Sequence, residues 1–305
     1  MRGRTWPAVV AGLALLMLVV GPLVLHFAQK RHDRLPFDVE AAFPPDRPMV
    51  SGEAFASTLA ALVRHELESP AGWRPNDVFL WGPDLWADNN ASRQLGIITA
   101  VRESTRVLRD HLTKISATEF DENLQAAQTD FQNDPEKWVF PSAESKLRQG
   151  VAALDRYVAG LQRTPRTSKP IQVRNVEVIR LFQIWSDLLG DAHGALYKEV
   201  EADGSPVRPW RSDDYFYHAQ GVAHVIHHLA RAVRREYADL LASRHVLGQL
   251  LDDVIAALGR AAVLKPLVVL DGRPDGLMPN HRRNLDVYVV EARQKLYSIR
   301  EELQN

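Results

Sequence analysis

The sequence predicts an all-α protein: a single N-terminal transmembrane helix followed by a multi-helix bundle of about seven or eight helices. Three observations support this fold class. The first is an uncharged apolar run near the N-terminus. The second is a series of segments whose apolar residues recur every three or four positions, which is the period of a helix with one buried face. The third is that no alternating apolar series is long enough for a sheet.

Composition narrows the function classes. The chain has 305 residues, of which 46% are hydrophobic and 25% charged, and it contains no cysteine. Disulfide scaffolds, thiolate metal sites and cysteine nucleophiles are therefore excluded. A formal net charge of -1 gives no basic surface of the kind that nucleic acid requires, so we expect no nucleic-acid partner.

Residues 1–34 are predicted to form a membrane anchor with basic flanks. The run from Trp6 to Phe27 has 22 residues without Lys, Arg, Asp or Glu. As a helix it would be about 33 Å long, enough to cross a hydrocarbon core of about 30 Å. A cleaved signal peptide would have a shorter apolar region and a small-residue cleavage site, and neither is present. We therefore expect an uncleaved signal-anchor.

The orientation of this anchor follows weakly from its flanks. Arg2 and Arg4 precede the apolar run, and Lys30, Arg31 and Arg34 follow it, so basic groups are nearly balanced across the segment. We expect a single span with a short N-terminal tail inside and a large exported C-terminal domain.

Residues 35–50 are predicted to be a linker, and residues 51–305 the helical bundle domain. The linker carries four prolines and no helical period, so an extended segment is expected. Within the bundle, Ser142 and the Thr118–Asp121 pair are candidate helix caps. Short strands are conceivable only at Val78–Trp81 and Leu267–Leu270. Six amphipathic stripes mark the expected helices: 55–67, 95–115, 147–161, 178–196, 213–241 and 285–303, with a further one over 246–264.

The strongest cluster of chemistry-bearing residues is a group of histidines in the stripe 213–241. His224 and His228 are four residues apart, a spacing at which two helical histidines can reach one zinc ion. His218 is the candidate third ligand. The glutamate of the H-E-x-x-H signature is absent, so an amphipathic helix with histidines along its edge explains the pattern more simply. Adjacent Asp213 and Asp214 are expected to cap and charge the start of the same helix.

The loop over residues 72–90 is a candidate interaction surface because it places three tryptophans among Pro, Asp and Asn. Such residues could line a ligand groove, or the tryptophans could plug the bundle while a polar residue caps the next helix. The candidate residues are Trp73, Asn76, Asp77, Trp81, Trp86, Asp88 and Asn89.

Five segments together resemble the uncharacterised bacterial DUF2333 family. They are GWRPNDVF (72–79), DNNASRQLG (88–96), WVFPSAES (138–145), PWRSDDYFYHAQGVAHVIHHLARAV (209–233) and NHRRNLDVYVVEA (280–292), in this order behind a membrane segment. The resemblance implies a membrane-anchored bacterial envelope protein of unknown activity and supplies no catalytic residues. His218, His224 and His227 depart from the family's usual pattern in the fourth segment.

Two hypotheses follow for the function. The first is a non-enzymatic binding or scaffolding module, tethered to the membrane, that contacts a protein or another envelope component. The second is a membrane-tethered, metal-dependent hydrolase that uses His218, His224 and His228. No nucleotide-binding loop or nucleophile elbow is present, so we expect no cofactor.

Overall fold

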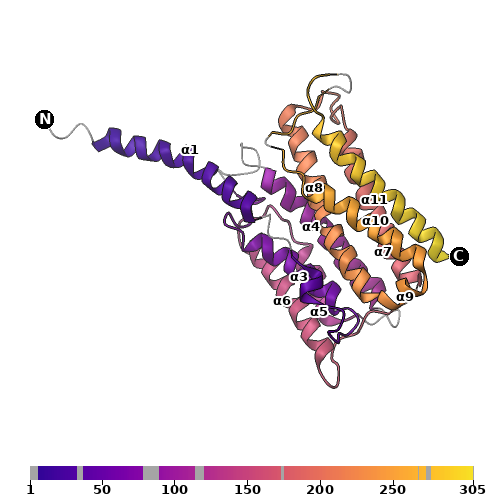
Figure 1. Ribbon diagram of the computed structural model, residues 1–305. Helices are drawn as coiled ribbons and strands as arrows, with labels where there is room; N and C mark the ends of the chain where they lie inside the picture. The colour runs from indigo at the N-terminus through magenta and orange to yellow at the C-terminus, as the bar shows by residue number, and fades with distance from the viewer. Residues whose placement is uncertain are drawn as a thin grey trace.

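The computed structural model confirms the all-α class over the part of the chain that it describes (Figure 1). The described residues are 6–32, 37–77, 89–113, 120–172, 175–266, 268–272 and 276–304. Within them the only β-type pairings are two isolated bridges, Val200 with Pro206 and Asp271 with Asn280. The second bridge lies just after the strand candidate Leu267–Leu270, whereas the candidate Val78–Trp81 lies outside the described residues.

Eight described helices of ten or more residues follow the first one, in agreement with the expected seven or eight. Two short helices and one π-helical turn were not expected. The elements are α1 (Trp6–His32), α2 (Val39–Ala42), α3 (Glu53–Leu67), α4 (Asn89–Val107), η1 (Leu108–Leu112), α5 (Glu122–Phe131), α6 (Ala143–Gln162), α7 (Asn175–Tyr197), α8 (Pro209–Glu236), α9 (Ala238–Ser243), α10 (His245–Ala262) and α11 (His281–Gln304).

Local capping explains several helix boundaries. The side chain of Ser142 accepts a hydrogen bond from the Ser145 amide, which confirms it as the N-cap of α6. Asp121 is the N-cap of α5, where its carboxylate accepts from the amides of Asn123 and Leu124. Asp213 and Asp214 do not cap α8, because that helix begins at Pro209 with Arg208 as its N-cap. A proline at the first helical position loses no intrahelical hydrogen bond, so it starts the helix one turn earlier than expected.

Helix α8 is the centre of the bundle. It packs against α3, α4, α7, α10 and α11, and so its apolar residues are buried on several faces. Phe216, Val222, Val225, Ile226 and Leu229 are all at most 1% exposed. A helix that is apolar on more than one face cannot lie on a surface, which explains why the longest helix of the bundle occupies its middle.

The contact between α4 and α8 depends on two glycines. A Cβ atom on Gly96 of α4 would overlap the backbone carbonyl oxygen of His218, and one on Gly221 of α8 would overlap that of Arg93. The Cβ atom on Gly221 would also lie 2.9 Å from the backbone nitrogen of Ile97. Because backbone atoms cannot move aside as a flexible side chain can, the two helices can approach this closely only without side chains at these positions.

Helix α1 projects away from the bundle (Figure 1). Large apolar side chains along it are exposed, among them Trp6, Leu13, Leu16 and Met17. Among the residues that the structure describes, no helix has the combination of length and apolarity needed to cross a membrane.

The segment 35–50 differs from the expected extended linker, because its described part, from Phe37, is packed on the bundle. It contains α2, and Val39 and Phe43 are buried at 1% and 4% exposure. Arg235 of α8 donates hydrogen bonds to the carbonyl oxygens of Phe43, Pro44, Pro45 and Arg47. Because proline has no N–H to donate, this segment cannot satisfy its carbonyl groups by continuing as a helix, and a single guanidinium donates to four of them.

We predict that Gly221→Ala destabilises the protein. The added methyl group must separate α4 from α8, and overpacking of this kind costs about 1–3 kcal/mol or more. Urea unfolding of the detergent-solubilised chain, followed by circular dichroism, measures the change. Gly194→Ala on α7 is the matched control, because nothing lies within 4 Å of its new Cβ. The control is expected to gain up to about 1 kcal/mol from helix propensity. Equal stability of Gly221→Ala and the wild type would contradict the close crossing.

Candidate functional site

The loop after α3 and the start of α6 meet at one end of the bundle. The indole nitrogen of Trp73 donates to the carbonyl oxygen of Pro135 at 2.8 Å. The amide nitrogen of Asn76 donates to a carboxylate oxygen of Glu144 at 2.9 Å and to the Lys137 carbonyl at 3.3 Å. Trp73 is only 4% exposed, so it plugs the bundle rather than offering a contact surface.

A polar hollow opens beside this junction. Its volume is about 480 Å³, and it is lined by Asn76, Asp77, Trp138, Ser142, Glu144 and Arg148. We call these six residues the Asn76 hollow. Two carboxylates, an amide, a guanidinium and an indole face one space, so the hollow can donate, accept and stack on a bound polar group. The hydroxyl oxygen of Ser142 also caps α6.

Buried charges set the electrostatics of the hollow. Arg74 and Asp77 form an ion pair at 2.8 Å, with Arg74 almost fully buried. Burial raises the pKa of the Asp77 carboxyl; the Arg74 cation opposes this shift and the negative charge of Glu144 adds to it. Burial also lowers the pKa of Arg74. The charge on Asp77 therefore depends on how well water reaches its carboxyl group. A bound group that displaces water from the hollow would raise the pKa of Asp77 further.

Helix α4 fixes the loop that supplies Asn76 and Asp77. The side chain of Gln94 accepts from the Arg74 amide at 2.8 Å and donates to the Gly72 carbonyl at 3.1 Å. Its amide nitrogen also donates to Glu66 on α3, which in turn pairs with Arg93 at 2.9 Å. These groups are buried, so a polar network ties the loop to two helices at once.

The predicted interaction surface is thus only partly assembled. Asn76 and Asp77 meet in the hollow, Trp73 is a plug, and Asn89 is the first residue of α4. Trp81, Trp86 and Asp88 lie outside the described residues. Sequence reasoning missed Trp138, Glu144 and Arg148 as partners of the loop. Two of them could have been predicted, because Trp138 and Glu144 belong to the segment WVFPSAES that carries the family resemblance.

The histidines of α8 stack on one another inside the bundle. The ring centroids of His224 and His228 are 4.7 Å apart, and those of His227 and His228 are 5.0 Å apart, both with edge-to-face geometry. The Nδ1 atom of His227 lies 2.9 Å from the Ile255 carbonyl oxygen. His228 is 2% exposed, and its Nδ1 atom is buried without a hydrogen-bond partner.

The surroundings favour neutral imidazoles. Burial lowers the pKa of His228 to about 3, assisted by the nearby positive charges of His227, Arg93 and His65. Burial likewise lowers the pKa of His224 well below its usual value, and that of His227 and His218 to a smaller extent. Within the part of the chain that the structure describes, no hydrogen bond or ion pair joins these rings to a carboxylate.

The structure brings no third ligand to His224 and His228 among the residues that it describes. Among the described residues, no group of three or more His, Asp or Glu side chains is arranged to hold a metal ion. His224 and His228 do share a helix face, as their spacing predicts. His218 instead lies at the α4 crossing, where its backbone faces Gly96.

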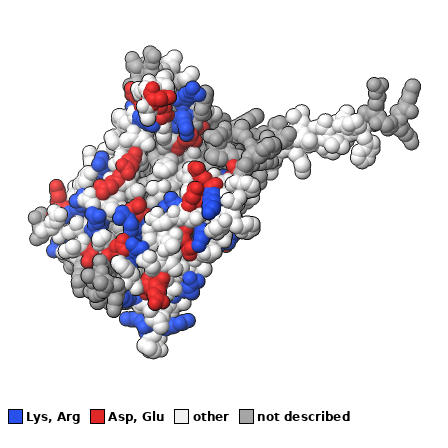
Figure 2. Space-filling view, turned by 180° about the vertical axis from the view of Figure 1, so that it is seen from behind, with Lys and Arg blue, Asp and Glu red and all other residues white. Residues whose placement is uncertain are grey.

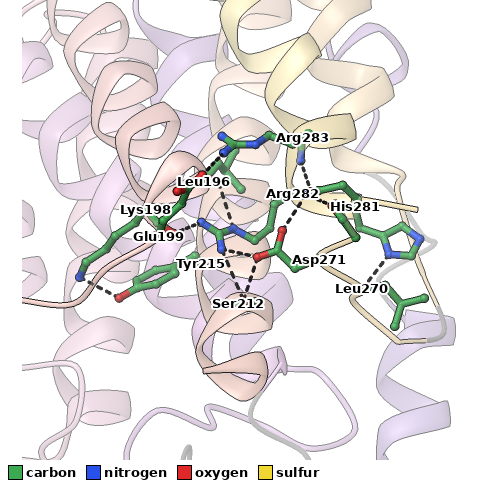
Figure 3. A network of polar contacts seen from close by, with 12 residues as sticks. Leu196, Lys198, Glu199, Ser212, Tyr215, Leu270, Asp271, His281, Arg282 and Arg283 are labelled. Carbon is green, nitrogen blue, oxygen red and sulfur yellow. Dashed lines mark hydrogen bonds and ion pairs between the residues drawn. The ribbon is translucent and has the colours of Figure 1, made fainter. Parts of the chain in front are cut away.

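A second polar network surrounds Arg282 of α11, near the start of α8 (Figure 3). Arg282 is 2% exposed and donates to the carbonyl oxygens of Ala195, Leu196 and Lys198, at the C-terminus of α7. It also pairs with Asp271 at 2.8 Å. A cation at these carbonyls satisfies groups that the helix leaves open and complements its dipole, so this network has a structural role.

The Asp213–Asp214 pair lies near the start of α8. Asp214 accepts a hydrogen bond from Ser92 of α4 at 2.8 Å, and burial together with the charge of Asp214 raises the pKa of Asp213 to about 6. The pair therefore links α4 and α8 near their crossing.

Comparison with known proteins yields one match. A family described as "Uncharacterized protein conserved in bacteria (DUF2333)" matches residues 2–202 and 171–305, which together cover nearly the whole chain. No curated protein and no solved structure matches.

We predict that acid destabilises the protein through His228. Its pKa is about 3 in the folded state and near 6.5 when unfolded, so the unfolded chain binds more protons between these values. The stabilisation is complete above pH 6.5 and is lost as the pH falls, by about 1–2 kcal/mol between pH 7 and 5. Urea unfolding at both pH values should show a smaller loss for His228→Phe. Val225→Ala, a control in the same buried stretch, should lower stability equally at both pH values. The same loss in His228→Phe and the wild type would refute this account.

Proposed function

The chain belongs to the DUF2333 family of proteins conserved in bacteria, and we propose that it is a membrane-anchored helical envelope protein that binds a partner through the Asn76 hollow. The proposal has two parts. One is the anchor, which the sequence of residues 6–27 supports. The other is a non-enzymatic binding role, which the hollow and its surroundings support.

The single observation that carries the anchor is the uncharged run Trp6–Phe27 within a helix that stands apart from the bundle. Counted in the sequence, and so including positions whose side chains the structure does not describe, its 22 residues would as a helix be about as long as a bilayer core is thick, at about 1.5 Å per residue. In Figure 2 the described side chains of the projecting part include no Lys, Arg, Asp or Glu, whereas both signs of charge are interspersed over the visible face of the bundle. Water-soluble proteins seldom expose so many large apolar side chains together, and lipid would cover them.

The sidedness of the proposal rests on size and charge. Basic residues flank the run on both sides, so the positive-inside rule discriminates little. A large helical bundle follows the run. We place the residues before the run in the cytoplasm, the span in the inner membrane and the bundle in the periplasm.

The binding role is supported by the residues that line the hollow. The hollow is open, is built from segments that carry the family resemblance, and mixes both charges with an exposed indole. Its hydrogen-bonding groups are already positioned by Gln94, Trp73 and the α6 cap, so binding would cost little ordering of the site. A protein or another envelope component with exposed polar groups fits such a surface.

The anchor is tested by membrane extraction. We predict that the full chain stays with bacterial membranes through alkaline carbonate washing and is released only by detergent. A variant with Leu13, Leu16 and Val20 changed to Asp should be released by carbonate, because each charge at the centre of a span costs about 2.5–3.5 kcal/mol. A reporter active only outside the cytoplasm, fused after Asn305, should be active. Release of the wild type by carbonate would contradict the anchor.

The hollow is tested by photo-crosslinking in cells. A photoreactive amino acid in place of Arg148 should give a discrete crosslinked product, because its side chain lines the hollow. The matched control replaces Val246, which is 53% exposed on α10, far along the chain from the hollow. Asp77→Ala should reduce the Arg148 product severalfold. The same product from both positions, or none from Arg148, would contradict a binding role for the hollow.

A further inference from the structure

The Asn76 hollow has the size of a site for a small ligand or for a short stretch of a polymer. Its volume of about 480 Å³ lies within the range of about 300–1,000 Å³ that is usual for ligand pockets. A stable interface between two proteins draws on about 20–30 residues of each partner, whereas six residues line the hollow. The hollow by itself is therefore better matched to a small molecule, or to one or two units of a chain, than to the surface of a protein.

The charges around the hollow are balanced. Asp77 and Glu144 each bring a negative charge, and Arg148 brings a positive charge. Arg74 brings the second positive charge, through its ion pair with Asp77 at 2.8 Å. A ligand with many negative charges would be repelled by the two carboxylates, and one with many positive charges by the two guanidinium groups. The balance favours a ligand that is polar but uncharged.

The two carboxylates are already oriented, and both can accept further hydrogen bonds. Arg74 holds Asp77, and the side-chain nitrogen of Asn76 donates to Glu144 at 2.9 Å. A carboxylate has about four lone-pair sites, so one such contact leaves room for others. Arg148 lies one helical turn after Glu144 on α6, and a guanidinium can only donate. The hollow thus offers acceptors beside a donor, which suits hydroxyl groups, because each hydroxyl both donates and accepts.

Trp138 adds a flat apolar surface to this polar space. It lines the hollow and is 64% exposed, so most of its surface is open to solvent. The backbone before it is fixed, because the Lys137 carbonyl oxygen accepts hydrogen bonds from the Ala143 amide and from the Asn76 side chain. A pyranose ring has C–H groups on its faces and hydroxyl groups around its edge. Its C–H groups can pack on the face of an indole while its hydroxyls bond to polar groups around it.

We propose that the Asn76 hollow binds an uncharged glycan, with one pyranose ring stacked on Trp138 and its hydroxyl groups bonded to Asp77, Glu144 and Arg148. This inference rests on the function proposed above, since it names the partner of the same hollow. The size of the hollow, its balanced charge and its single exposed indole among hydrogen-bonding groups all match a sugar ring.

Saturation-transfer NMR tests the proposal with two soluble probes, the tetramer of N-acetylglucosamine and maltotetraose. The full chain is reconstituted in phosphatidylcholine nanodiscs, so that no detergent with a sugar headgroup competes for the hollow. The variants are Trp138→Ala, Trp138→Phe and Arg148→Ala, and the exposure of Trp138 means that its replacement leaves the core intact. Tyr297→Ala is the matched control, because Tyr297 is an aromatic residue of α11 that is 36% exposed and does not line the hollow.

We expect at least one of the two sugars to receive saturation, most strongly at the C–H protons of one ring. Its dissociation constant should rise about tenfold in Trp138→Ala, the size of a lost aromatic stacking contact. It should rise severalfold in Arg148→Ala, change little in Trp138→Phe, which keeps an aromatic face, and stay unchanged in Tyr297→Ala. No transfer to either sugar, or equal affinity in Trp138→Ala and the wild type, would overturn the glycan site.

Tryptic digestion of the product that is photo-crosslinked at position 148 separates this inference from the proposed function. A glycan partner predicts a product without peptides of a second protein. Peptides of a second protein, with no transfer to either sugar, would overturn the glycan site and leave the binding role of the hollow intact. The absence of any crosslinked product, again with no transfer to either sugar, would overturn both.

Discussion

The close crossing of α4 and α8 is the constraint on which the rest of the structure depends. Gly96 and Gly221 allow each helix to place backbone against the backbone of the other. Helix α8 then reaches α3 on one side and α7, α10 and α11 on the other, so a single helix joins all the layers of the bundle. Any side chain at these two positions would separate the helices and open the core around Val222 and Ile226.

This crossing also explains how distant segments come together. Residues just before Gly96 hold the loop of Asn76 through Gln94, and Ser92 of the same helix bonds to Asp214 of α8. Farther along the chain, Arg282 joins the start of α11 to the end of α7. The segments that carry the family resemblance are therefore mainly the ones that fix helix to helix, and the hollow is built where two of them meet at the surface.

Helix positions could be predicted from the sequence because they depend on local periodicity and capping. The stripe 147–161 and the cap Ser142 needed no knowledge of the rest of the chain. The packed course of residues 37–50 could not be predicted, because it depends on Arg235, nearly two hundred residues away. Only part of the hollow could be predicted. Asn76 and Asp77 belong to an unusual loop with three tryptophans, whereas nothing in the sequence distinguishes Arg148 from other charged residues on a helix face. The stacked histidines share a helix face as predicted, but only tertiary packing decides that they are buried and lack a carboxylate partner.

The crossing itself can be tested by a disulfide, since the chain has no cysteine of its own. Ser92 and Asp214 are hydrogen-bonded across α4 and α8 at 2.8 Å, so cysteines at these positions face each other. The close crossing predicts that their Cα atoms come within the distance of about 7 Å that a disulfide requires. Oxidation of the Ser92→Cys, Asp214→Cys double variant, followed by mass spectrometry of the unreduced digest, should yield the two linked peptides in high yield. The pair Ser92→Cys, Val246→Cys should remain reduced. Free thiols in the first pair under the same conditions would contradict the arrangement of α4 and α8 on which the fold and the hollow depend.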